Sequence, residues 1–436
     1  MSTLKVNKIR DTSGSADAIT LDPSGGAVLA GVTTISTARI TTGITTSIQV
    51  GGGVTISESG IEASGIGITC ANINGTQIGG RKNLIINGAM QIAQRATSYT
   101  GGGYETVDRF FVDLAGLDEN PTQAQVDVSS GTTPYTLGFR KAYKITNGNQ
   151  TSGAGAGDVI YIKQKIESRN VSNSGWNYTS ASSFVTLQFW IKSSVAQTFT
   201  CHLSTEDGTS YIYNFDTGSL AANTWTKIVK TIPGNSNLTF DHDTGKGVEI
   251  QWDMFSGTTY TSGSTVDQWV TYNGNTSAPD ETADWWTTND ATFELTGVQL
   301  EVGQVATPFE HRSFADELRL CKRYFNMYSR THADSGDEAI IANGFYWSSS
   351  RFMAPLRFDV PMRTNSWSLY KVTGSSYFRI YNNGGGSHQV NDFGLNGQAH
   401  VSSAHLNIDS GISSSGDAGV FFTLDSAARI GFDAEL

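Results

Sequence analysis

Two clusters of acidic and aromatic residues are the places in this 436-residue chain where side chains could hold or cleave a sugar. The segment DETADWW, residues 280–286, sets three carboxylates beside two adjacent indoles. The segment STEDGTSYIY, residues 204–213, sets an acid pair near two tyrosines. Indole faces stack on the C–H surfaces of sugar rings, and carboxylates accept hydrogen bonds from hydroxyl groups. Asp284, Trp285 and Trp286 are therefore predicted ligand-binding residues.

Catalysis is the alternative chemistry for these clusters. Glycosidases need two carboxylates about 5 to 10 Å apart across a sugar cleft. In both clusters the acids are adjacent or nearly adjacent within an expected turn, which is typical of a solvated loop tip. The sequence also shows no Ser/His/Asp arrangement or phosphate-binding loop. We therefore expect a binding protein and not an enzyme.

The two indoles are not expected to act together. Adjacent residues of a strand point to opposite faces, so at most one of Trp285 and Trp286 would face a ligand. Packing of both indoles in a core is the alternative. Trp269 and Tyr272 are also predicted ligand-binding residues, with core packing as the alternative. Tyr381 begins the Gly-rich loop YNNGGGSHQ, which marks a competing site.

A third acidic segment could bind a metal ion. FDHDTGKG offers Asp241, Asp243 and the carbonyl of Gly245, a fragment of the alternating oxygen pattern that calcium loops use. The later acidic ligand of such loops is absent, so a simple turn is the alternative. A structural calcium is the only cofactor that the sequence suggests.

The composition limits the fold and the partners. The chain has 29 basic and 40 acidic residues, and a net charge of −11 repels the phosphates of nucleic acid. Charged residues make up only 16%, and 48 Gly accompany 8 Pro, a profile that favours β-strands joined by tight turns. No apolar run approaches the ~20 residues of a membrane span, and the first residues lack the apolar core of a signal peptide. We expect a mainly β protein without membrane insertion, assembled in a cytoplasm.

The first 98 residues contain no Phe, Trp or Tyr. Short Ile, Val and Thr runs, punctuated by Gly, predict short strands there, but such a segment buries too little apolar area to fold alone. Three copies wound around one axis would cover the strand edges and bury these side chains. Residues 1–80 are thus predicted to form a trimeric β-shaft, with a flexible linker as the alternative. The apolar positions that favour the shaft are Ile35, Ile40, Ile44, Ile48, Val54 and Ile56.

Residues 81–312 have the pattern of a globular β-sandwich. The alternating runs VTLQFWIKSS, TWTKIVKTIPG and VEIQWDMFSG predict strands, and ATFELTGVQLEVG predicts a closing strand. Trp225 and Trp252 are expected to fill the space between the sheets.

A helix is expected at Phe314 to Tyr328, within a connecting segment of residues 313–330. Ser313 can cap its N-terminus, and apolar residues spaced four and three apart share one face. That face could pack on a neighbouring domain or line a three-fold axis. Residues 331–436 return to strands and predict a small β-rich tip domain.

Five segments of the sequence resemble segments of known proteins. NLIINGAMQIAQR and YETVDRFFVD resemble the opening of the carbohydrate-binding-module-like domain common in phage tail fibres, and ELTGVQLEVGQVATPFEHRSFADELRLCKRYF resembles its closing segment and following helix. FDVPMRTNSW is similar to the strand that follows in many of these proteins, although Asn365 stands where many have Pro. The first 26 residues resemble the start of fibre proteins from phages of marine bacteria, especially cyanobacteria.

This resemblance implies a jelly-roll sandwich in an elongated homotrimer, with a structural calcium often present in such modules. It also implies an N-terminus docked on a phage tail or adaptor protein, and distal domains that bind host surface polysaccharide or lipopolysaccharide. The expected location is the virion, after assembly in the host cytoplasm. The alternatives are a structural fibre or whisker on the capsid or tail and, with less support from the sequence, a polysaccharide depolymerase.

Overall fold

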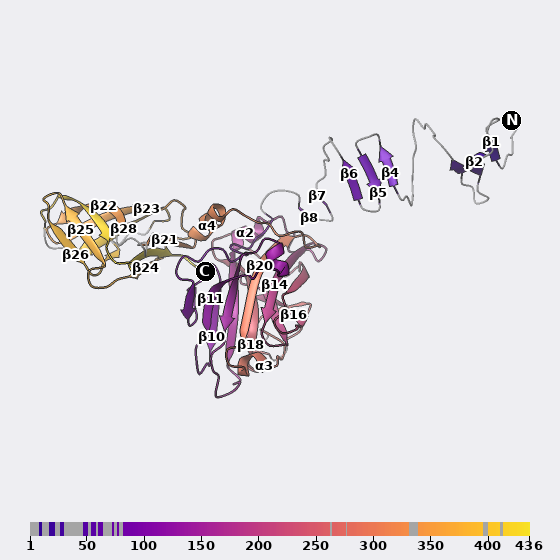
Figure 1. Cartoon of the computed structure of the whole chain (residues 1–436), viewed down its shortest axis with the longest axis horizontal. Coiled ribbons are helices and arrows are strands. Elements are labelled where there is room, and N and C mark those ends of the chain that lie inside the picture. The colour runs from indigo at the N-terminus through magenta and orange to yellow at the C-terminus, as the bar shows by residue number, and fades with distance from the viewer. Residues whose placement is uncertain are drawn as a thin grey trace. The chain divides into compact units, whose positions relative to one another are not determined.

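The computed structural model describes eight short strands between residues 8 and 77, and residues 82–436 apart from 262–263, 276, 331–338, 396–399 and 410–412 (Figure 1). The chain divides into two units, Met1–Cys70 and Ala71–Leu436. No helix in the described part of the chain is long and apolar enough to cross a membrane.

Short antiparallel strands occur in the aromatic-free region, as the Ile/Val/Thr runs predict. One three-stranded sheet contains β1 (Lys8–Arg10), β2 (Asp17–Leu21) and β3 (Ala27–Leu29), and another contains β4 (Ser47–Val50), β5 (Val54–Ser57) and β6 (Gly60–Ala63). A hairpin of β7 (Asn72–Ile73) and β8 (Thr76–Gln77) follows. Ile35, Ile40 and Ile44 lie outside the described residues. The homotrimer stays a prediction.

The expected β-sandwich is present as two six-stranded antiparallel sheets. Sheet I has the order β10 (Phe111–Ala115), β13 (Val159–Glu167), β18 (Lys246–Ser256), β15 (Thr198–Thr205), β16 (Tyr211–Ser219) and β19 (Trp269–Thr271). Sheet II has the order β17 (Thr226–Pro233), β14 (Phe184–Ser193), β20 (Thr292–Val302), β12 (Lys141–Thr146), β11 (Thr122–Asp127) and β9 (Ser98–Thr100). The short helices α1 (Thr133–Thr136), α2 (Ser168–Ser172) and α3 (Asp284–Thr287) lie in the connections.

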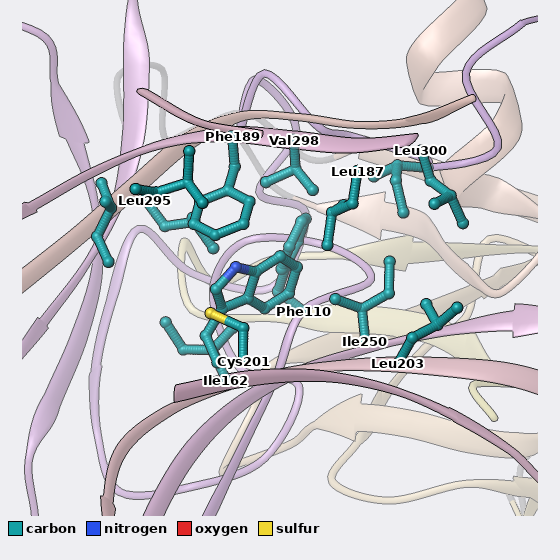
Figure 2. Packing of buried hydrophobic residues seen from close by; sticks show 14 of the residues in the cluster. Phe110, Ile162, Leu187, Phe189, Cys201, Leu203, Ile250, Leu295, Val298 and Leu300 are labelled. Atoms are coloured by element: carbon teal, nitrogen blue, oxygen red, sulfur yellow. The ribbon is translucent and has the colours of Figure 1, made fainter. Parts of the chain in front are cut away.

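The core between the sheets follows from strand alternation. In Figure 2, Leu187 and Phe189 of sheet II face Leu203 and Ile250 of sheet I, and all four side chains are buried. Trp252 is also fully buried there, with its ring 5.7 Å from that of Phe189, so its predicted place in the core is confirmed.

The same prediction for Trp225 was wrong. Its ring is only partly buried, outside the main core, and the Lys192 ammonium lies 5.1 Å from the ring centroid. Trp225 stands one residue before β17 begins, where the alternation of that strand does not yet fix the direction of a side chain.

The connecting helix, α4 (Phe314–Lys322), is shorter than predicted. The Ser313 hydroxyl accepts a hydrogen bond from the backbone N–H of Asp316 at 3.2 Å, so the predicted cap is confirmed. The helix ends at Lys322 because the chain enters β21 (Phe325–Arg330), whose first residue is fully buried. Cys321 packs against apolar residues of the sandwich, so the helix has a face on this neighbouring domain.

The C-terminal part forms a second β-domain with its own core. Its seven-stranded sheet has the order β26 (Ser387–Val390), β25 (Phe378–Asn382), β29 (Ala418–Thr423), β22 (Ala339–Ser348), β23 (Arg351–Arg357), β28 (Ser403–Asp409) and β27 (Gly394–Leu395). A three-stranded sheet has the order β21, β30 (Arg429–Asp433) and β24 (Ser368–Val372).

The strand expected at FDVPMRTNSW is absent. Residues 358–367 contain no strand, and β23 ends just before them at Arg357. Pro361 has no N–H to contribute to a ladder, so a regular strand is disfavoured here. Phe358 and Trp367 instead pack against Phe432, at centroid distances of 4.7 and 5.0 Å, and fill the second core.

Buried ion pairs join the C-terminal segment to the sandwich. Arg95 contacts Asp433 at 2.8 Å, and Arg109, also buried, pairs with Glu435. Both arginines belong to the segments that resemble the opening of the phage domain. Those segments therefore take part in the contact between the sandwich and the C-terminal segment.

Candidate functional site

Both indoles of the DETADWW cluster are inside the core. Trp285 and Trp286 are 0% and 1% exposed, and their ring N–H groups donate to the carbonyls of Thr292 and Gly153 at 3.1 and 2.8 Å. The expectation that one of them faces a ligand assumed a strand, but the segment forms the helical turn α3. Neither ring offers a stacking face, so the structure corrects this part of the predicted site.

Asp284 remains at the surface, at the start of α3. It lines a hollow of about 310 Å³ together with Gln197, Asp280 and Glu281. We call this the acidic hollow, and its wall also contains Thr200 and Asp216. The carboxylates of the predicted cluster thus gather without the indoles.

The other predicted ligand residues are spread over two domains. Trp269 is half-buried on β19, where its ring N–H donates to the Pro233 carbonyl at 2.7 Å, and Tyr272 follows that strand with an exposed ring. Tyr381 lies on β25 of the C-terminal domain, and its hydroxyl accepts a hydrogen bond from Arg379 at 2.7 Å. The structure does not bring Tyr381 together with the residues of the sandwich.

The predicted metal ligands Asp241 and Asp243 lie close together, and Asp207 joins them. Carboxylate oxygens of the three residues lie within 4.8 Å of one another. Burial raises the pKa of Asp207, and the two neighbouring carboxylates raise it further, which a cation would oppose. The carbonyl of Gly245, the third predicted ligand, accepts the backbone N–H of Ser168 at 3.0 Å. The oxygen set suits calcium, and calcium binding stays a prediction.

A second hollow, of about 440 Å³, lies on the outer face of sheet II. Its wall is rich in aromatic rings, with Trp190, Phe139, Phe309 and His311 among them. Phe139 and Phe309 meet edge to face at 4.9 Å. We call this the aromatic hollow. Its other lining residues are Leu137, Gln188, Lys227, Gly297, Ala306, Thr307 and Pro308.

Strand alternation on β14 points the relevant side chains outward. Leu187, Phe189 and Ile191 belong to the core, so Gln188 and Trp190 lie on the opposite face of the sheet. The neighbouring strand β17 places Lys227 beside Trp190 in the antiparallel register.

The segment after β20 forms a wall of the aromatic hollow. Glu301 accepts the backbone N–H of Thr307 at 2.8 Å and its hydroxyl at 2.6 Å, while the Gln188 amide donates to the Thr307 carbonyl at 2.6 Å. Gly297 has a φ of +64°, and a Cβ there would lie 2.7 Å from the Phe139 ring. Glycine at this position therefore allows the Phe139 ring to pack against the sheet.

Apolar side chains around the aromatic hollow are exposed. Leu137, a lining residue, is 51% exposed, and Val305, next to the lining residue Ala306, is 48% exposed. Val229 of β17 pairs with Gln188 and is 46% exposed. Exposed apolar side chains gathered around one hollow are typical of a surface that binds a ligand or a partner.

The sequence contained a signal for this site that the prediction did not use. The run VTLQFWIKSS was assigned to a strand for its alternation, and its outward phase contains Gln188, Trp190 and Lys192. The contribution of Phe139 and Phe309 had no such signal, because they are far from β14 in sequence.

No family model matches the sequence, and no curated protein matches it. The structure is similar in part to the enzymatically active domain of bacteriophage CBA120 tailspike protein 4, with 10% identity, a TM-score of 0.28, and coverage of 50% of this chain and 21% of that chain. It is also similar to a CBM4 structure, with 13% identity and a TM-score of 0.26. That match covers 50% of this chain and 97% of the CBM4 chain. A third similar structure is the CBM22-1 xylan-binding domain of Paenibacillus barcinonensis Xyn10C, with 9% identity and a TM-score of 0.24. That match covers 48% of this chain and 94% of the CBM22-1 chain. This chain spans about a fifth of the tailspike structure.

Proposed function

We propose that this chain is a bacteriophage tail fibre that attaches the virion to its host by binding cell-surface carbohydrate. The resemblance of its segments to phage appendage proteins supports the virion role. The single observation that carries the binding role is the aromatic hollow, which places Trp190 beside polar side chains on the outer face of a sheet.

The chemistry of the aromatic hollow suits a sugar. Aromatic rings bind the C–H faces of pyranoses, and hydrogen-bonding groups beside them fix the orientation of the ring. The exposed ammonium of Lys227 is a donor for hydroxyl or carboxylate groups of a polysaccharide or lipopolysaccharide. The hollow has about the volume that small-ligand sites require.

The proposed fibre is a homotrimer docked on the tail or on an adaptor protein through its N-terminus. Three sandwiches on one fibre bind a repetitive surface together, so a modest affinity at each hollow is multiplied by avidity. The net charge of −11 favours a carbohydrate partner over nucleic acid.

The test compares two tryptophan substitutions in the full chain. Trp190→Ala removes the indole of the aromatic hollow, and Trp347→Ala removes an indole that is 64% exposed on β22 of the C-terminal domain. Binding of fluorescent fibre to host cells is measured before and after the surface polysaccharide is stripped. A stacking contact is worth about 0.5 to 1.5 kcal/mol beyond its buried area, so Trp190→Ala should weaken binding severalfold.

Lys227→Met serves as a second variant if Trp190→Ala lowers the thermal transition. Its side chain is exposed, so the fold should be unaffected while hydrogen bonding in the hollow is lost. Equal cell binding by wild type, Trp190→Ala and Lys227→Met would refute the proposed site. Loss of binding in Trp347→Ala alone would move the receptor site to the C-terminal domain.

A further inference from the structure

The acidic hollow is lined by Gln197, a buried side chain whose amide nitrogen has no hydrogen-bond partner among the described residues. Gln197 is 6% exposed and lines the hollow, and its Nε2 makes no hydrogen bond to any described residue. Its Oε1 accepts the backbone N–H of Trp285 at 2.8 Å. Reversing the amide would turn a donor toward that N–H, so the observed orientation is fixed. A buried donor without a partner is rare, and this one calls for an acceptor from a ligand.

The acidic residues around Gln197 have different roles. Both carboxylate oxygens of Glu281 are occupied, because they accept the backbone N–H groups of Thr200 and Ser256 at 3.0 Å each. Glu281 therefore fastens the segment before α3 to strands β15 and β18. The Asp284 carboxylate is at the surface and accepts no hydrogen bond from any described residue. It is left to receive a donor from a ligand.

This donor and acceptor set selects the class of ligand. A bare cation would satisfy Asp284 but would leave the Gln197 N–H without an acceptor, and an anion would be repelled by the carboxylates. A hydroxyl group both donates and accepts, so two neighbouring hydroxyls can serve Asp284 and Gln197 together. We propose that the acidic hollow is a second binding site, which takes the vicinal hydroxyl groups of a neutral sugar.

The proposal rests on the proposed carbohydrate binding for the source of its ligand, but it uses different residues. The acidic hollow and the aromatic hollow share no lining residue. Each site can therefore be removed without touching the other.

The experiment measures saturation-transfer NMR and titration calorimetry of the full chain with methyl glycosides of glucose, mannose and galactose. Gln197→Glu keeps the acceptor for Trp285 and removes the donor, and Asp284→Asn removes the charged acceptor at the surface. Asp290→Asn is the matched control, since Asp290 is exposed nearby and does not line the hollow. A hydrogen bond to a charged group predicts about a tenfold loss of affinity in Asp284→Asn for at least one glycoside, and no loss in Asp290→Asn.

The outcomes separate the two proposals. If Trp190→Ala lowers glycoside affinity while Asp284→Asn and Gln197→Glu do not, the second site is refuted and the aromatic hollow stands. If the two acidic-hollow variants lose affinity while Trp190→Ala does not, the second site stands and the first is refuted. If calcium alone binds and Asp284→Asn abolishes its binding, the acidic hollow is a cation site and the proposal is wrong.

Discussion

Arg323 and Glu167 form a two-pronged ion pair between the end of α4 and the end of β13. Arg323 donates from Nε and a terminal nitrogen to the two Glu167 oxygens at 2.7 and 2.8 Å, and the Tyr324 hydroxyl donates to the same carboxylate at 2.5 Å. Glu167 is fully buried. Parallel paired bonds of this kind fix geometry as well as adding energy, so they hold the connecting helix on the sandwich.

This ion pair predicts a loss of stability in acid. Burial raises the pKa of Glu167, but the hydrogen bonds from Arg323 and Tyr324 outweigh burial, and the net pKa lies below the usual range. Its contribution is therefore complete above the usual glutamate pKa and is lost as pH falls through the lowered value. Glu167→Gln should lower the free energy of unfolding by about 2 kcal/mol at neutral pH, because it removes the charged acceptor of the half-buried Arg323 and of the buried Tyr324 hydroxyl.

Thermal unfolding from pH 7 to pH 3 measures this effect. Glu206→Gln is the control, since Glu206 pairs with Lys246 at a partly exposed position where about 1 kcal/mol or less is expected. Equal stability of Glu167→Gln and wild type at neutral pH would contradict the assigned role.

The contribution of Asp253 to stability should have the opposite dependence on pH. Burial raises its pKa to about 7, even though the Gln251 amide donates to it at 2.6 Å and Lys163 lies nearby. The carboxyl is protonated more readily in the folded chain, so its contribution is complete below the usual aspartate pKa and is lost as pH rises through about 7. Asp253→Asn should therefore raise the melting temperature relative to wild type more at pH 8 than at pH 5. A difference in melting temperature that stays constant from pH 5 to pH 8 would show that another group causes the pH dependence. Glu281 would then be the first residue to substitute.

Calcium should stabilise the sandwich through the three carboxylates near α2. An ion that binds the folded chain alone raises the midpoint of thermal unfolding with its concentration. Addition of calcium should raise the midpoint, a chelator should reverse the rise, and Asp207→Asn should abolish it. Asp267→Asn, at an exposed acid outside this group, should leave the response intact. A midpoint of thermal unfolding that does not change with calcium concentration would show that these carboxylates do not form a calcium site.

The aromatic-free region should drive trimer assembly. Light scattering of the full chain should give three times the mass of one chain, because the strand edges and Ile/Val rows of residues 1–80 need partner copies. A chain that begins at Arg81 should keep its folded sandwich but associate more weakly. Monomeric full-length protein, or trimers of equal stability with and without residues 1–80, would count against the shaft.

The sequence alone determined the features that depend on neighbouring residues. Alternation in VTLQFWIKSS predicted β14, Ser313 predicted the cap of α4, and the low charge and many glycines predicted a mainly β chain. These follow from local periodicity and local hydrogen bonding, which a short window of sequence contains.

Only the tertiary structure decided which residues meet. Asp207 reaches Asp241 and Asp243 because a loop after β15 lies beside the loop before β18, and no local pattern records that contact. For Trp285 and Trp286 the sequence left two alternatives, one ring facing a ligand or both rings in a core, and the structure buries both in a helical turn. Periodicity tells which residues share a face, but which face becomes core and which is left as a binding surface depends on elements that pack from far along the chain.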